Sequence, residues 1–76
     1  MPHVEIKCFP GRTEAQKKEC ADRIAEAIAE TLGCKTSSVS VAIKDVAEDD
    51  WKEKVWDKCI APDIDNLYKK PGYTCE

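Results

Sequence analysis

Polar and apolar residues alternate along the first nine positions of the chain. The apolar positions are Val4, Ile6 and Cys8, and the polar positions between them are His3, Glu5 and Lys7. A period of two is typical of a half-buried strand, since successive side chains point to opposite faces. We therefore predict a strand over residues 2–9, which the Pro-Gly pair at 10–11 ends.

The spacing then changes to that of a helix. Thr13 and Gln16 fit the capping-box pattern that begins many helices. Gly33 stands where a helix commonly ends, because glycine adopts the left-handed conformation at low cost. The apolar residues between these signals are Cys20, Ile24, Ala27, Ile28 and Leu32. They recur on one face, which predicts a helix over residues 13–32.

A second alternating segment follows the polar loop 35–38. Val39, Val41 and Ile43 alternate with Ser40, Ala42 and Lys44. A strand, a long helix and a second strand predict a βαβ unit with parallel strands.

The last third of the chain has helical spacing with an interruption. We expect Asp49 or Asp50 to cap a helix. Its apolar face would comprise Trp51, Val55, Trp56, Cys59 and Ile60, continued by Ile64, Leu67 and Tyr68. Pro62 either kinks this helix or opens a second one. Residues 69–73 end the helical part and lead into a short tail. The predicted fold class is thus α/β, a single βαβ unit with a C-terminal helical segment, forming one domain over residues 1–76.

The predicted sheet is too small to stand by itself. A two-stranded parallel sheet leaves both edges and much apolar surface open to water. A chain of 76 residues also has only a small core. We therefore expect a homodimer in which two copies complete a larger sheet.

Composition narrows the classes of partner. The formal net charge is -3 and 36% of residues are charged, which describes a soluble, mildly acidic protein. Basic residues form no stripe with interleaved aromatics, so we expect no nucleic-acid partner. No apolar run is long enough to span a membrane, and the first residues do not read as a signal peptide. We expect a cytoplasmic protein with no membrane partner.

The cysteines agree with a reducing compartment. There are five cysteines, widely spaced and never in a Cys-x-x-Cys motif, and the chain has a single histidine. This pattern predicts neither a disulfide framework nor a metal site. We interpret Cys8, Cys20 and Cys59 as small buried apolar residues, and Cys75 as an exposed thiol near the C-terminus.

Pro2 is the most informative candidate for chemistry. If Met1 is removed, Pro2 carries a free secondary amine at the N-terminus. An α-amino group titrates nearer to neutrality than lysine does, so it can act as a base at working pH. The alternative interpretation is structural, because a proline is tolerated at the first position of a strand.

Four further signals occur in a fixed order after Pro2. Gly-Arg-Thr at 11–13 leads into the helix, Gln-Lys at 16–17 lies on it, Ser-Val at 38–39 opens the second strand, and Trp51 follows. Together they resemble the 4-oxalocrotonate tautomerase family over roughly the first fifty residues. Trp-Asp at 56–57, Ile-Ala-Pro at 60–62 and Lys-Lys-Pro-Gly-Tyr at 69–73 resemble a dimeric branch of the same family.

The resemblance implies a keto-enol tautomerase that acts on 2-oxo acids without a cofactor. Pro2 would be the general base and then the acid, Arg12 would bind a substrate carboxylate, and Trp51 would wall the site. Ser40 stands where well-known members have a second arginine, which favours a monocarboxylated enol such as phenylenolpyruvate. The Ser40 hydroxyl or nearby amides would bind the enolate oxygen.

This role makes physical sense for an amine. A group that takes a proton from oxygen and returns it to carbon works best with a pKa near the operating pH. An apolar wall and a nearby cation both lower the pKa of an ammonium group. Trp51 can supply the first and Arg12 the second. Arg12 can also hold a carboxylate with two parallel hydrogen bonds.

Other interpretations remain open. Arg12 could simply be solvated, Trp51 and Trp56 could both be core residues, and His3 could be an exposed or interface residue that at most tunes the local charge. The same proline could serve dehalogenation, decarboxylation or hydration, with Glu5, Asp45 or Glu48 activating water. The chain could also be a non-catalytic dimeric binding module.

Overall fold

The computed structural model describes residues 1–76, in two compact units. The first unit is Met1–Asp45 and the second is Val46–Glu76. Each unit is described by itself.

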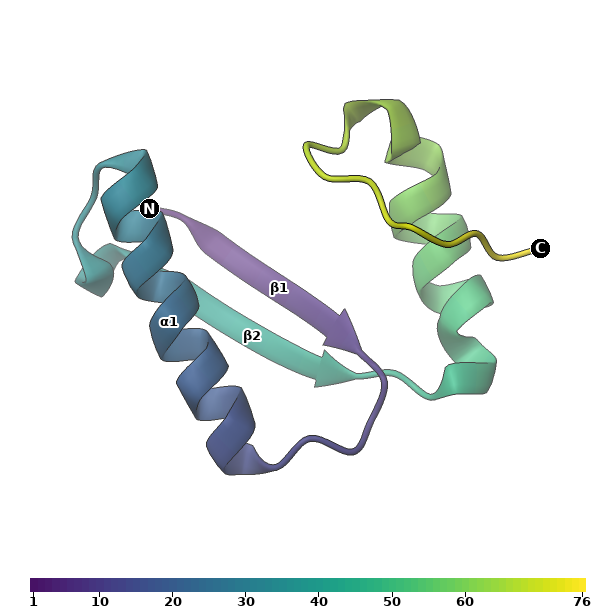
Figure 1. Ribbon diagram of the computed structural model, residues 1–76, viewed down its shortest axis with the longest axis horizontal. Helices are drawn as coiled ribbons and strands as arrows, with labels where there is room; N and C mark the ends of the chain where they lie inside the picture. The colour runs from purple at the N-terminus through teal and green to yellow at the C-terminus, as the bar shows by residue number, and fades with distance from the viewer. The chain divides into compact units, whose positions relative to one another are not determined.

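The first unit is a βαβ unit, as predicted. Strand β1 spans His3–Cys8, helix α1 spans Glu14–Leu32 and strand β2 spans Ser40–Asp45 (Figure 1). The strands pair in parallel as a two-stranded sheet. Their register runs from His3 opposite Ser40 to Cys8 opposite Asp45, so both strands begin at one end of the sheet and finish at the other.

Helix α1 begins and ends at the predicted signals. The Thr13 side chain accepts a hydrogen bond from the Gln16 amide at 3.1 Å, and the Gln16 side chain accepts one from the Thr13 amide at 2.8 Å. Gly33 has φ 72°, the left-handed conformation, and its amide donates to the Ala29 carbonyl. Both caps satisfy backbone groups that a helix end would otherwise leave unpaired.

An ion pair joins α1 to the end of β2. The Lys17 ammonium lies 3.1 Å from the Asp45 carboxylate, and only 18% of the Lys17 side chain is exposed. Asp45 accepts a hydrogen bond from Lys17 and thereby raises the pKa of that lysine above its ordinary value.

A short 3₁₀ turn, η1 at Thr36–Ser38, leads into β2.

The second unit is helical, but not as one regular α-helix. It comprises the 3₁₀ turn η2 at Glu48–Asp50, the π-helix η3 at Lys52–Ile60 and the 3₁₀ helix η4 at Ala61–Asn66. The expected aspartate cap is wrong, because no side chain caps η2 or η3. The Asp50 carboxylate instead accepts a hydrogen bond from Lys54 at 3.3 Å. Pro62 lies at the start of η4, so it opens a new helical element instead of kinking η3.

An aromatic cluster links the two ends of the second unit. Val55 and Trp56 are the two buried hydrophobic residues of the chain, which confirms Trp56 as a core residue. The Tyr73 ring lies 5.5 Å from the Trp56 ring, centroid to centroid. The Tyr73 hydroxyl accepts a hydrogen bond from the Trp51 indole at 3.0 Å. The C-terminal tail is thereby held against η3.

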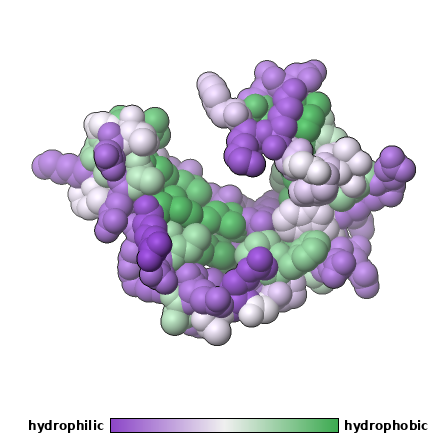
Figure 2. Space-filling view, in the orientation of Figure 1, coloured by the Kyte–Doolittle hydropathy of each residue, from purple (hydrophilic) through white to green (hydrophobic).

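Much apolar surface stays open in a single chain. No residue of α1 is buried, and Leu32 is 70% exposed. Figure 2 shows apolar surface over the strands beside α1. The strand residues Val4, Ile6, Val41 and Ile43 are only half-buried. A two-stranded sheet and one helix cannot enclose these side chains, because each covers only one side of the other.

The cysteine expectations are partly wrong. Cys20 and Cys59 are exposed, Cys8 is half-buried, and Cys75 is half-buried instead of exposed; all five are free thiols. No residue of α1 is buried, which explains the exposure of Cys20.

No helix is both long and apolar enough to cross a membrane.

Candidate functional site

Pro2 lies just before β1, at the end of the sheet where both strands begin. It is half-buried, whereas Met1 before it is fully exposed. The Pro2 carbonyl accepts a hydrogen bond from the Ser40 amide at 3.2 Å. This bond fixes the position of Pro2 against β2. It does not involve the Pro2 nitrogen.

Ser40 and His3 form a polar pair beside Pro2. They are opposite one another in the register, so their side chains lie on the same face of the sheet. The His3 Nδ1 and Ser40 Oγ atoms are 2.6 Å apart, a short hydrogen bond between two exposed side chains. Ser40 thus reaches Pro2 through its backbone and His3 through its hydroxyl.

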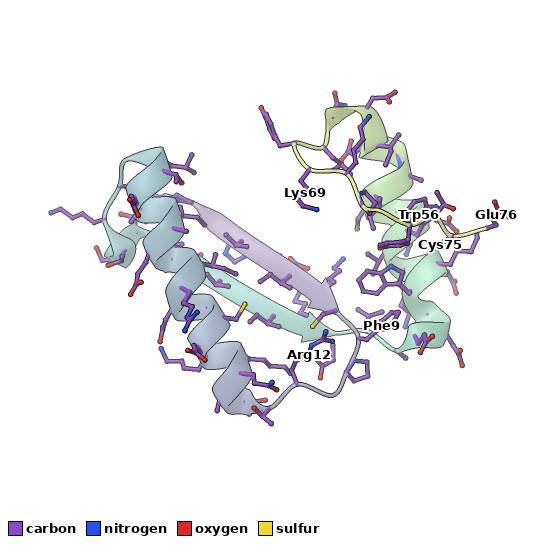
Figure 3. All side chains as sticks on the ribbon, viewed as in Figure 1. Phe9, Arg12, Trp56, Lys69, Cys75 and Glu76 are labelled. Carbon is purple, nitrogen blue, oxygen red and sulfur yellow. The ribbon has the colours of Figure 1, made fainter.

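Arg12 occupies the loop between β1 and α1. Its Nη1 donates a hydrogen bond to the Phe9 carbonyl at 2.8 Å, which holds the guanidinium near the end of β1 (Figure 3). Arg12 also lines a cavity of about 180 Å³ with Ile6, Ile43 and Gln16. Arginine has five N–H donors, so the bond to Phe9 leaves donors for an anionic ligand.

The first unit therefore separates two of the predicted site residues. Pro2 precedes β1 and Arg12 follows it, with six strand residues between them. A strand rises about 3.3 Å per residue, which places the two ends roughly 20 Å apart. An arginine side chain cannot span that distance. Within one chain, the structure brings Pro2 together with Ser40 but not with Arg12.

Trp51 belongs to the second unit. It is half-buried, and its indole N–H is oriented by the Tyr73 hydroxyl. The predicted wall residue is thus held by the C-terminal tail, while Trp56, one turn further on, is buried in the unit.

The carboxylates considered for water activation differ in their surroundings. Glu5 lies 3.3 Å from Lys44 and 3.9 Å from Lys7, and Asp45 is paired with Lys17. Glu48 is exposed in η2. No group of three or more His, Cys, Asp or Glu is arranged to hold a metal ion.

Two features of the site region were not predicted from the sequence. One is the His3–Ser40 bond, for which the shared polar face of two parallel strands was a usable signal. The other is the Trp51–Tyr73 bond, which joins residues 22 positions apart and has no local sequence signal.

Comparison with known families gives one match over most of the chain. Residues 2–53 match the family model described as Tautomerase enzyme. The proteins named Tautomerase PptA of Enterobacter sp. (strain 638) and of Cronobacter sakazakii (strain ATCC BAA-894) are 52% and 47% identical to this chain. The first alignment covers 97% of this chain and 99% of the relative, and the second covers 96% and 97%.

Solved structures agree in fold. One of the 4-oxalocrotonate tautomerase isozymes from Methylibium petroleiphilum superposes with a TM-score of 0.62 at 34% identity, covering 66% of this chain and 81% of that one. YwhB, a homologue of 4-oxalocrotonate tautomerase, gives a TM-score of 0.60 at 33% identity over 63% and 79% of the two chains.

Proposed function

This chain belongs to the tautomerase enzyme family, and we propose that it interconverts the enol and keto forms of a monocarboxylated 2-oxo acid, with Pro2 as the proton carrier. The enzyme is thus an isomerase. The position of Pro2 carries the proposal: it is fixed by the Ser40 amide through its carbonyl, beside exposed polar side chains, with its nitrogen left for chemistry.

The proposed mechanism begins with removal of Met1. Met1 is fully exposed, so a processing enzyme can reach it, and the residue after it is small. Removal converts the Pro2 nitrogen from an amide, which cannot accept a proton near neutral pH, into a secondary amine. The neutral amine takes the proton from the enol oxygen and returns it to the substrate carbon. One proton moves and no electrons are exchanged with a second molecule, so the step needs no cofactor.

The remaining site residues are proposed to bind the substrate. Arg12 holds the carboxylate with paired hydrogen bonds. Trp51 forms an apolar wall that, with Arg12, lowers the pKa of the protonated amine. Ser40 faces the oxygen that becomes negatively charged, where a hydrogen-bond donor stabilises the transition state more than the ground state.

The separation of Pro2 from Arg12 supports a homodimer with shared sites. When a two-fold axis perpendicular to the sheet pairs two copies edge to edge, their adjacent strands run antiparallel. The start of β1 in one copy then approaches the end of β1 in the other. Arg12 of one subunit would serve Pro2 of its partner. The half-exposed apolar residues of the strands and of α1 supply surface for such an interface.

We further propose that residues 1–76 act as one domain in the cytoplasm. The curated relatives align with nearly the whole chain and over nearly their whole length, which supports one functional piece. Five free thiols are typical of a reducing compartment.

A substrate panel tests this function. Protein of verified mass, lacking Met1, is assayed with phenylenolpyruvate, with a halogenated unsaturated acid and with a β-keto acid. We expect rapid ketonisation of the first and little turnover of the others. Faster dehalogenation or decarboxylation would assign Pro2 to the alternative chemistry.

A further inference from the structure

We propose that the His3–Ser40 pair is an oxygen-binding subsite, in which Ser40 contacts the enol oxygen of the substrate and His3 is the positioning residue. This inference rests on the proposed function, because it assigns a role at the Pro2 site. Its basis is the 2.6 Å bond between His3 Nδ1 and Ser40 Oγ, directly opposite each other beside Pro2.

The location suits a ligand that also contacts Pro2. The Ser40 amide is bonded to the Pro2 carbonyl at 3.2 Å, so Ser40 cannot move along the strand without moving Pro2. Both His3 and Ser40 are exposed, which leaves their outward atoms accessible. Further along the same face, Glu5 lies between two lysines, 3.3 Å from Lys44 and 3.9 Å from Lys7.

The hydrogen-bonding groups that His3 and Ser40 present depend on which ring nitrogen of His3 carries the proton. If Nδ1 carries the proton, it donates to Ser40 Oγ, and the serine hydroxyl is free to donate outward. If Nδ1 is bare, the serine donates to it, and the opposite ring nitrogen, Nε2, carries the outward N–H. In either tautomer the pair presents one outward donor and one outward acceptor. Such a pair fits a hydroxyl that becomes a carbonyl.

The hydrogen-bonding groups of the pair also affect which substrates it can bind. A second carboxylate bonded to Ser40 would lose its hydration and gain only a bond from a neutral hydroxyl, which is weaker than a bond to a cation. A carbonyl or enol oxygen loses far less on leaving water. The subsite therefore selects enols with a single carboxylate, which the proposed Arg12 contact already satisfies.

His3 acts through Ser40. A serine hydroxyl rotates freely unless a partner fixes it, and a fixed donor is more effective because it needs no reorientation when charge develops. The short bond to Nδ1 provides that partner when Nδ1 carries the proton, because the serine O–H then stays available for the substrate. Removing His3 should therefore have the same consequence as removing the hydroxyl, and removing both should cost no more than removing one.

The test compares kcat and KM for phenylenolpyruvate in Ser40→Ala, His3→Ala, the double variant and His3→Asn, all lacking Met1. We expect Ser40→Ala and His3→Ala each to lower kcat about ten-fold with a smaller change in KM, as loss of one hydrogen bond in the transition state would. The double variant should match the single ones. His3→Asn should recover much of the rate, because its side-chain amide takes the place of Nδ1.

Two controls make the result decisive. Ser37→Ala removes an exposed hydroxyl from η1 in the same unit and should leave kcat unchanged. Retention of Met1, which makes the Pro2 nitrogen an amide, separates the two hypotheses. If retention of Met1 abolishes turnover while Ser40→Ala and His3→Ala match wild type, or if their losses multiply in the double variant, the subsite is wrong and the proposed function stands. If turnover survives in the Met1-retaining protein, the proposed function itself fails.

Discussion

Pro2 and Arg12 lie at opposite ends of β1 within one chain. The strand between them is His3–Cys8, and the Arg12 guanidinium is held at the far end by the Phe9 carbonyl at 2.8 Å. Figure 1 marks the N-terminus at the start of β1, and Figure 3 shows Arg12 beyond its end. If both residues serve one reaction, they must come from two copies of the chain.

Subunit mixing tests this arrangement. Pro2→Ala with Met1 retained, in which the nitrogen at position 2 is an amide, and Arg12→Ala lacking Met1 should each be nearly inactive alone. After the two variants are mixed and allowed to exchange subunits, half of the dimers are mixed, and each mixed dimer has one site with both native residues. About a quarter of the wild-type rate should then return. The rate is measured by ketonisation before and after exchange.

The control for mixing is each variant taken alone through the same exchange procedure, which should restore nothing. If the mixture also stays inactive although mass spectrometry shows mixed dimers, Arg12 does not act across subunits.

Replacing Ser40 by arginine should change the substrate preference. Ser40→Arg places a cation beside Pro2, where the native chain has a neutral hydroxyl. We expect kcat/KM for a dicarboxylated enol to rise about ten-fold or more relative to phenylenolpyruvate, because a charged donor binds a carboxylate more strongly. Ser40→Lys is the matched comparison, since it adds charge without a paired donor. An unchanged ratio in both variants would place the second carboxylate elsewhere.

The Lys17–Asp45 pair should stabilise the first unit in a pH-dependent manner. The pair raises the pKa of Lys17, so the folded state holds this proton more tightly than the unfolded state does. Its contribution is complete below the ordinary lysine pKa and is lost as the pH rises through the raised value. Lys17→Met should therefore lower the urea midpoint at pH 8, and the difference from wild type should shrink at strongly alkaline pH.

Lys18→Met serves as the control for this change. Lys18 pairs with Asp22 at 2.6 Å on the same helix, but 76% of its side chain is exposed. Exposed pairs contribute little, about 0.2–1 kcal/mol. An equal effect of both substitutions would mean that helix charge, not the link to β2, determines the change.

Tyr73 should hold Trp51 in place. Tyr73→Phe removes the hydroxyl that accepts the Trp51 N–H at 3.0 Å and keeps the ring beside Trp56. We expect a loss of about 0.5–1.5 kcal/mol in unfolding free energy and a shift in tryptophan emission. Tyr68→Phe is the matched control, because Tyr68 is fully exposed. Identical emission in all three proteins would contradict the bond.

The sequence predicted those elements whose signals are local. Thr13, Gln16 and Gly33 mark the ends of α1 because caps depend on residues within one turn. Alternation predicted both strands, and parallel pairing followed from the length of the connection. Pro62 was correctly read as a break, since its missing N–H acts on its own helix.

The structural features that the sequence did not predict lack a local sequence signal. Apolar spacing alone does not distinguish the π-helical hydrogen bonding of η3 from an α-helix, and the Asp50 carboxylate accepts a bond from Lys54 instead of capping a helix. Cys20 and Cys59 read as core residues because apolar periodicity does not reveal how much of a face a small unit can cover. The His3–Ser40 bond required the strand register, which periodicity alone leaves open.

The most direct test of the central claim is the ketonisation rate of phenylenolpyruvate as a function of the N-terminus. Three samples are compared: protein shown by intact mass to begin at Pro2, the same protein with Met1 retained, and Pro2→Ala lacking Met1, whose N-terminus is a primary amine. Retaining Met1 converts the Pro2 nitrogen to an amide and should reduce kcat at least 100-fold, while circular dichroism and dimer mass stay unchanged. We predict full turnover in the first sample, none in the Met1-retaining protein and a reduced rate in Pro2→Ala. Equal rates in the Met1-retaining protein would contradict a role for the Pro2 amine.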